Sequence, residues 1–417
     1  MALDSTITKT AITNFVNGIG TAGNKLDVEN LVFNRSVSKK FVKMLGKVKS
    51  TTATVGANTY TLTAPGAVSM FELFDEGESL APSYNENGTL DINSDVNLPT
   101  VVLGGTFVSK ATNIVDGQEF PVAFTQEVSG KTVSIYDATF ADHIYVVAKS
   151  NEQVNLEGCI IDNRNGGIST GKSSQNNGNK AGNNANCAVN VAGCNPKSVA
   201  MKDMVYYCSD NQGNQKMYNL IEITGGSATK KIDIEGCQFL GKATNNGVSI
   251  YDCADGAVIN VKDCWFEDVS NVLRVSNQAN KTNVTINFEN CVIESWEHRS
   301  GAYLDYAGFC ICQDYTSPAA NAAANNLYGK DANGNPKITI NIKNCTGPNG
   351  PIQIASGKTY ADYCMNSQPD QLCYVYRDKA GGLVPFDADV YPVINVSYDA
   401  NTVRTLTKKS IPALENA

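Results

Sequence analysis

A ten-residue pattern recurs along the chain, and it limits the folds that the sequence can adopt. Each copy alternates apolar and polar residues, passes a small residue, Asp or Asn, and then reaches a Cys followed by bulky residues. Alternation with period two predicts β-strands. The strong copies are VNLEGCIIDN at 154–163, IDIEGCQFLG at 232–241, INVKDCWFED at 259–268, INFENCVIES at 286–295 and INIKNCTGPN at 340–349. Weaker copies are VAMKDMVYYC at 199–208, VSIYDATFAD at 133–142 and VVLGGTFVSK at 101–110.

The spacing of the copies is regular. The Cys residues of the last four strong copies lie 27, 27 and 54 residues apart, and the long step coincides with an insertion at 317–337. Further period-two segments lie between or after copies: NLIEI at 219–223, VSIYDC at 248–253, VLRVS at 272–276, FCICQ at 309–313 and IQIAS at 352–356. A fixed period of short strands and Asn/Gly turns, without helical periodicity, is typical of a solenoid. The sequence therefore predicts an all-β chain folded as a parallel β-helix.

The repeated Cys has a physical explanation in such a fold. Residues at one position of successive copies would stack about 4.8 Å apart. Thiols fill a corner of a core without needing hydrogen bonds. We therefore expect a structural column formed by Cys159, Cys237, Cys264, Cys291 and Cys345. All 13 Cys lie at or after Cys159, and Met1–Thr6 lacks the basic and apolar start of a signal peptide, so we expect reduced thiols.

Over about residues 100–360, these copies resemble the right-handed β-helices of pectin lyase-like proteins and phage tailspikes. The resemblance implies a right-handed coil. It is specific for the fold and says little about chemistry.

Four segments follow from the pattern. Residues 1–50 are not repeat-like and are predicted to be a small, partly helical anchor, with one helix from Ser5 or Thr6 to Asn17 and a second from Ser36 to Leu45. Residues 51–100 are assigned to a linker and N-terminal cap, 101–360 to the β-helix and 361–417 to a β-rich C-terminal cap. Proposed anchoring residues are Phe15, Val16, Lys39, Lys40 and Phe41. The basic residues around Lys39 are either a solvated face or a contact for an acidic protein surface.

Composition excludes several classes of partner. The chain has 33 basic and 41 acidic side chains and a net charge of −8, which argues against nucleic acid. It has no apolar run long enough to span a membrane. With two His residues, His-based catalysis and His-rich metal sites are disfavoured, and no cofactor or metal site is expected.

One loop could carry chemistry. Glu294, Glu297 and Asp305 cluster after the copy at 286–295, and Trp296 could serve as a sugar platform. Tailspike glycosidases need two carboxylates at a suitable separation. A depolymerase site formed by these carboxylates is the weaker hypothesis, and a polar loop carrying surface ion pairs is the stronger one.

The favoured function is that of a tailed-bacteriophage virion protein. The layout resembles phage head fibres and tailspikes. The Asn/Thr/Gly/Tyr-rich strands and the start MALDSTITKT resemble proteins of crAss-like phages. We expect synthesis in the host cytoplasm, attachment to capsid or tail proteins through the N-terminus, assembly as a homotrimer or other homo-oligomer, and non-catalytic contact with cell-surface glycans. The alternatives are a β-helical polysaccharide depolymerase or lyase, and a bacterial β-helix scaffold protein.

Overall fold

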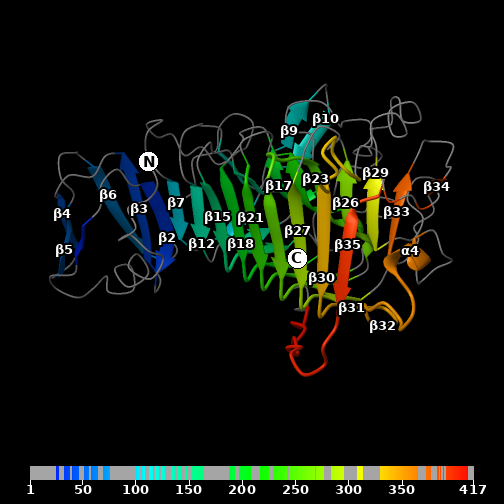
Figure 1. Ribbon diagram of the computed structural model, residues 1–417. Helices are drawn as coiled ribbons and strands as arrows, with labels where there is room; N and C mark the ends of the chain where they lie inside the picture. Colours follow the sequence, from blue (N-terminus) through cyan, green and yellow to red (C-terminus); the bar gives the residue numbers. More distant parts are fainter. Residues whose placement is uncertain are drawn as a thin grey trace.

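The computed structural model describes a defined part of the chain, and every structural statement below concerns that part. The described residues are 25–27, 32–37, 40–46, 51–55, 58–63, 69–75, 100–103, 106–108, 112–115, 118–121, 124–126, 133–136, 139–141, 146–148, 153–162, 187–192, 197–207, 217–224, 229–241, 244–267, 269–276, 283–294, 308–312, 329–364, 372–376, 383–384, 386, 388 and 391–411. Strands dominate them (Figure 1). The predicted all-β class is confirmed.

Three long sheets hold most of the strands, and we call them sheets I, II and III. Sheet I has twelve strands, and sheets II and III have nine each. Neighbours within a sheet are mostly parallel and come from sequence segments that are not adjacent along the chain.

The bounds of sheet I are β2 (Val32–Val37), β3 (Lys40–Gly46), β6 (Ser69–Asp75), β7 (Thr100–Leu103), β12 (Val133–Tyr136), β15 (Gln153–Glu157), β18 (Ser198–Lys202), β21 (Lys231–Glu235), β24 (Val258–Lys262), β27 (Val284–Glu289), β30 (Ile338–Lys343) and β35 (Val393–Ser397). Those of sheet II are β8 (Thr106–Val108), β13 (Thr139–Ala141), β16 (Ile160–Asp162), β19 (Val205–Tyr207), β22 (Gln238–Leu240), β25 (Trp265–Phe266), β28 (Val292–Ile293), β31 (Thr346–Gly347) and β32 (Gly350–Pro351). Those of sheet III are β11 (Phe124–Gln126), β14 (Val146–Ala148), β17 (Cys187–Ala192), β20 (Met217–Thr224), β23 (Thr244–Asp252), β26 (Val269–Ser276), β29 (Phe309–Cys312), β33 (Cys373–Tyr376) and β34 (Leu383–Val384).

The chain visits the three sheets in turn. From β21 to β26, consecutive strands enter sheets I, II and III and then I, II and III again. Each ten-residue copy of the sequence therefore supplies a strand of sheet I, a corner, and a short strand of sheet II. The segment between copies supplies sheet III. This arrangement is compatible with a β-helix-like solenoid, and we call one such set of three strands a repeat.

The register of sheet I follows the sequence pattern. Ile232 pairs with Ile259, which pairs with Ile286, and the column continues through Ile340 to Ile394. These Ile side chains are buried, whereas the residues before and after them face outward. A shift of one residue would turn every Ile toward solvent, so burial fixes the register.

The corner between sheets I and II explains the small residue, Asp or Asn that precedes the Cys of each strong copy and Met204 of the copy at 199–208. This residue has a positive φ in six successive repeats: Gly158 (67°), Asp203 (51°), Gly236 (67°), Asp263 (53°), Asn290 (53°) and Asn344 (55°). Gly, Asn and Asp enter this left-handed region most readily. The corner N–H donates to a carbonyl of the next repeat, as from Asp263 to Glu289 at 3.0 Å.

The predicted helix from Ser36 to Leu45 is wrong. Residues 32–37 and 40–46 form β2 and β3, which pair antiparallel, and β3 also pairs antiparallel with β6. The segment KFVKMLG also fits the alternation of a strand, and pairing with two neighbours decides between the two periods. The other predicted helix, from Ser5 or Thr6 to Asn17, lies outside the described residues.

Further strands lie beside the three sheets. Strand β1 (Lys25–Asp27) pairs with β5 (Asn58–Thr63), which pairs with β4 (Thr51–Val55). Strands β9 (Thr112–Val115) and β10 (Gln118–Pro121) form an antiparallel pair.

The C-terminal end departs from the regular pattern. Sheets II and III end in antiparallel pairs, β31 with β32 and β33 with β34. The segment IQIAS at 352–356, expected to be a strand, is irregular, and β33 continues sheet III instead. Helix α4 (Tyr360–Tyr363) lies nearby, and the Phe386 ring contacts the rings of Tyr360 and Tyr391, with centroids 5.3 Å apart in each pair.

Candidate functional site: the thiol column and the C-terminal strap

The repeated Cys residues lie directly after the corner, inside the core. Cys159, Cys237, Cys264, Cys291 and Cys345 are at most 1% exposed, and none forms a disulfide. The Cys264 thiol lies 3.2 Å from the Lys262 carbonyl oxygen and 3.6 Å from that of Ile234, in the preceding repeat. The Cys291 N–H donates to the Cys345 sulfur at 3.4 Å. The thiols therefore bond to the backbone and to one another.

The environment of Cys264, Cys291 and Cys345 keeps these three thiols protonated. Burial, followed by hydrogen bonding to Cys237, raises the pKa of Cys264, and burial followed by bonding to Cys264 does the same for Cys291. For Cys345 the hydrogen bond with Cys291 comes first and burial second. A protonated thiol is a poor nucleophile and a poor metal ligand. Within the described ranges, no group of three or more His, Cys, Asp or Glu is placed to hold a metal ion.

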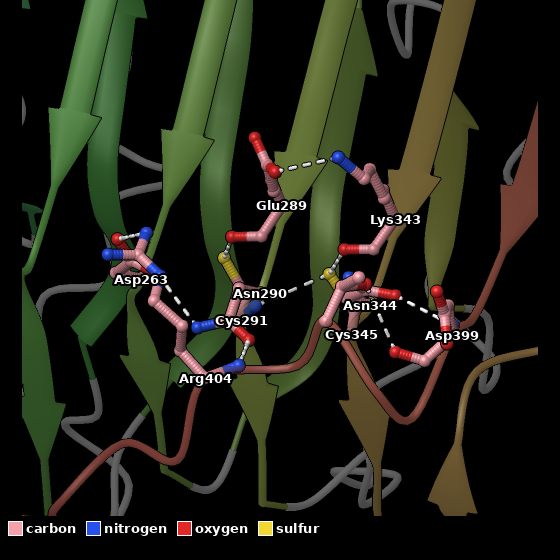
Figure 2. A network of polar contacts seen from close by, with 10 residues as sticks. Asp263, Glu289, Asn290, Cys291, Lys343, Asn344, Cys345, Asp399 and Arg404 are labelled. Atoms are coloured by element: carbon pink, nitrogen blue, oxygen red, sulfur yellow. Dashed lines mark hydrogen bonds and ion pairs between the residues drawn. The ribbon is translucent and has the colours of Figure 1, made fainter.

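On the outside of the same corner lies a segment that we call the strap, residues 398–411. It follows β35 and turns back over the strands of earlier repeats (Figures 1 and 2). Asp399 and Thr402 form the turn, in which the Thr402 N–H donates to the Asp399 carbonyl at 3.0 Å. From there the strap runs along the positive-φ corner residues toward β22.

Side-chain amides from three repeats hold the strap backbone. The Asn344 carbonyl oxygen accepts from the Asp399 N–H at 2.9 Å, and the Asn290 carbonyl oxygen accepts from the Arg404 N–H at 2.9 Å (Figure 2). Gln238 completes the series, accepting from the Lys409 N–H at 2.7 Å and donating to the Thr407 carbonyl at 2.8 Å.

Two basic residues of the strap meet carboxylates of the sheets. Arg404 forms an ion pair with Asp263, which also accepts a hydrogen bond from the Asn290 amide at 2.8 Å (Figure 2). Lys408 bridges two carboxylates, those of Glu267 and Glu294, each at 2.9 Å.

An aromatic ring lies in the same contact. The Lys408 ammonium is 5.9 Å from the centroid of the Trp265 ring, and the Trp265 indole N–H donates to Glu294 at 3.0 Å. Lys408 thus has both an ionic and a cation–π partner.

Mutual contact shifts the ionisation of Lys408 and Glu294. Burial pushes the pKa of Glu294 upward, but hydrogen bonds from Lys408 and Trp265 outweigh it and leave the pKa below its ordinary value. Burial pushes the pKa of Lys408 downward, but the hydrogen bonds to Glu294 and Glu267 leave it raised. Both groups therefore stay charged over the neutral range.

The structure describes only part of the residues singled out from the sequence. Of the candidate catalytic carboxylates, Glu294 is in the strap contact, whereas Glu297, Asp305 and Trp296 lie outside the described residues. Among the anchoring candidates, Lys40 and Phe41 belong to β3, and their side chains are not described. Phe15, Val16 and Lys39 also lie outside the described residues.

Sequence reasoning missed the strap residues Arg404 and Lys408, and also Gln238, which bonds to the strap backbone at Thr407 and Lys409. One signal pointed to them. The segment VINVS at 393–397 fits the template, and its Ile394 lies 54 residues after Ile340, as Cys345 lies 54 after Cys291. Recognising it as another sheet I strand places the basic segment after it at the corner.

Comparison with protein-family models, with curated proteins and with solved structures finds no match for this chain. No helix in the described part of the chain is long and apolar enough to cross a membrane.

Proposed function

We propose that the chain is a right-handed parallel β-helix and serves as a fibre or spike of a tailed-bacteriophage virion. The observation that carries the proposal is the unbroken series of paired strands from β7 to β35 in sheet I. At about 4.8 Å per strand, this series spans roughly 40 Å. A solenoid of this kind is rigid because each repeat is hydrogen-bonded to its neighbours along its length.

The thiol column supports folding in a reducing cytoplasm, which this proposal requires. The five thiols are buried and form no disulfide, and the pKa values of Cys264, Cys291 and Cys345 are raised, which suits a protein that folds in a reducing cytoplasm, such as that of a bacterial host. The protein would then be incorporated into the particle before release.

Attachment and adhesion divide between the two ends in this proposal. Residues 1–50 bind capsid or tail proteins, and the assembly is a homotrimer or another homo-oligomer. Loops and the distal end contact cell-surface glycans without cleaving them. Charged side chains of the described outer surface are drawn into ion pairs, such as Lys343 with Glu289 at 3.0 Å and those of the strap, which suits a structural surface.

Particle composition tests the assignment. Mass spectrometry of purified virions from a phage that encodes this chain is expected to detect it. Deletion of residues 1–50 is expected to abolish incorporation while circular dichroism shows the β-sheet signal of the rest. Absence from the particle would remove the virion assignment, and normal incorporation of the deleted chain would refute the anchor.

A polysaccharide depolymerase or lyase is the second candidate, and one observation favours it. Glu294 and Glu267 lie on the outer side of sheet II beside the half-buried Trp265, an arrangement that a sugar could use. A general acid needs a raised pKa, however, and Lys408 and Trp265 lower that of Glu294. Release of reducing ends from host capsule, lost in Glu294→Gln, would establish the enzyme. A bacterial scaffold remains the third candidate if no particle contains the chain.

A further inference from the structure

The strap carries a six-residue motif that occurs twice in the chain. Residues 404–409 read R-T-L-T-K-K, and residues 35–40 read R-S-V-S-K-K. Ser replaces Thr twice, and Val replaces Leu. The chain has three Lys-Lys pairs, at 39–40, 230–231 and 408–409, and two of them end this motif.

The structure shows how the sheets and corners bind the motif at 404–409. Asp263 pairs with Arg404, and Glu267 and Glu294 pair with Lys408 four residues later. The amides of Asn290 and Gln238 contact backbone groups, which every sequence possesses. The Thr405 and Thr407 side chains are exposed, and Leu406 is half-buried. The positions that determine recognition are therefore the Arg and the first Lys, and both are unchanged in the motif at 35–40.

The receiving surface favours a basic segment. It presents three carboxylates within two neighbouring repeats, and the ion pairs that the structure describes for them are all with the strap. The hydrogen bonds and ion pairs that the structure describes for the strap are made with side chains of the strands and of the corners that follow them. The backbone ladders of sheets I and II are already used between strands. A segment held in this way is exchangeable without opening a sheet.

We propose that this strap site also binds residues 35–40 of a second copy of the chain, in competition with the strap. Electrostatic complementarity carries the choice of occupant: an Arg and a Lys with the same spacing face the same three carboxylates. In the structure, this segment spans the end of β2 and the start of β3, where Val37 pairs with Lys40. Docking in the extended form requires this hairpin end to open, so the strap, which is tethered, occupies the site in the isolated chain.

The inference does not depend on the virion assignment, since it concerns two purified copies of one chain. It assigns a partner to the basic segment around Lys39, for which the sequence allows either a solvated face or a contact with an acidic protein surface. Particle incorporation and self-association are separate measurements, so either proposal can fail alone.

The first test measures peptide binding to the full-length protein. Labelled peptides FNRSVSKKFVK (residues 33–43) and TVRTLTKKSIP (residues 402–412) are titrated by fluorescence anisotropy against wild type and against R404E/K408E, whose own strap is repelled. Both peptides are expected to bind the variant at least tenfold more tightly than wild type. A scrambled peptide of the 33–43 composition is expected to bind weakly to both proteins.

Further variants identify the site. Adding E267Q and E294Q to R404E/K408E is expected to abolish binding of the 33–43 peptide. Replacing Arg35 and Lys39 by Glu in this peptide is expected to abolish its binding to R404E/K408E. Failure of the 33–43 peptide to bind, whether or not the strap peptide binds, would overturn the proposal. Equal binding of the scrambled peptide would also overturn it, because charge alone would then explain the result.

The second test uses the chain itself, at concentrations of tens of micromolar. In sedimentation velocity, R404E/K408E is expected to form larger species than wild type, and adding R35E/K39E is expected to reverse this change. Thermal melts of all variants confirm that they are folded. If R404E/K408E sediments as wild type does, or if R35E/K39E leaves its association unchanged, the second copy does not occupy the site.

Discussion

At the scale of single residues, Asn290 joins the corner to the strap. Its φ is 53°, its N–H donates to the Lys343 carbonyl at 2.8 Å, and its side chain contacts both Asp263 and Arg404. Asn290→Val is therefore expected to lower the free energy of unfolding by about 2–4 kcal/mol, because a β-branched residue is strained at positive φ and both amide hydrogen bonds are lost. Chemical denaturation followed by circular dichroism measures the change.

The matched control is Asn290→Gly, which tolerates the positive φ and removes only the side chain. We expect it to cost less than Asn290→Val, and the difference measures the strain. Equal losses in the two variants would show that the backbone conformation contributes nothing.

Cys264 tests the interior of the corner at the same scale. Its side chain is fully buried between the thiols of Cys237 and Cys291. Cys264→Asp is expected to destabilise the protein by roughly 3–5 kcal/mol, because the carboxyl group loses its hydration without gaining a charged partner. Urea titration would detect the loss as a lower midpoint.

Cys264→Ala is the control for lost volume, with an expected cost of about 1 kcal/mol. An Asp variant as stable as the Ala variant would mean that this side chain does not face the core in solution.

At the scale of elements, the strap is expected to loosen at acidic pH while the sheets remain folded. The folded-state pKa of Glu294 lies below its ordinary value of 4.5, so its contribution is complete above that value and is lost as pH falls through the lowered pKa. The pH dependence of Lys408 runs in the opposite direction. Because its pKa is raised, its contribution is complete below 10.5 and is lost as pH rises beyond that value. Because Glu294 is 41% exposed, the pair contributes at most about 1 kcal/mol.

The fluorescence of Trp265 follows this release, in a Trp296→Phe background that leaves it as the single Trp. We expect a transition below pH 4.5 that precedes the loss of the β-sheet signal. In E267Q/E294Q the transition should be absent. A Trp265 change that coincides with global unfolding would show that the strap is not a separate element.

The elements also show what the sequence could and could not predict. Ile232, Ile259 and Ile286 recur with the Cys period, and burial then fixed both strand type and register. The segment around Val42 fits a helix and a strand equally well, and only its partners β2 and β6 decide. The strap was hidden because its contacts join Arg404 and Lys408 to carboxylates 141 and 114 residues away, and no local pattern encodes such pairs.

At the scale of the whole molecule, the stacked repeats predict how the thiols become accessible. Each repeat is stabilised mainly by its immediate neighbours, so opening one interior repeat exposes unpaired strands on both sides. The thiols of Cys237, Cys264 and Cys291 lie in interior repeats, whereas Cys345 lies nearer the end formed by β35. The repeats that hold Cys237, Cys264 and Cys291 should therefore open together, and the repeat near β35 that holds Cys345 should open before them.

Alkylation coupled to mass spectrometry measures this order. In native protein at neutral pH, we expect Cys237, Cys264 and Cys291 to react at least a hundredfold more slowly than in denaturant, because all three are buried, and the raised pKa values of Cys264 and Cys291 also favour their protonated forms. With rising urea, Cys345 should become reactive before the interior three, which should follow with one common midpoint. Independent midpoints for Cys237, Cys264 and Cys291 would mean that adjacent repeats are not coupled, and the continuous rod that the virion proposal requires would lose its mechanical basis.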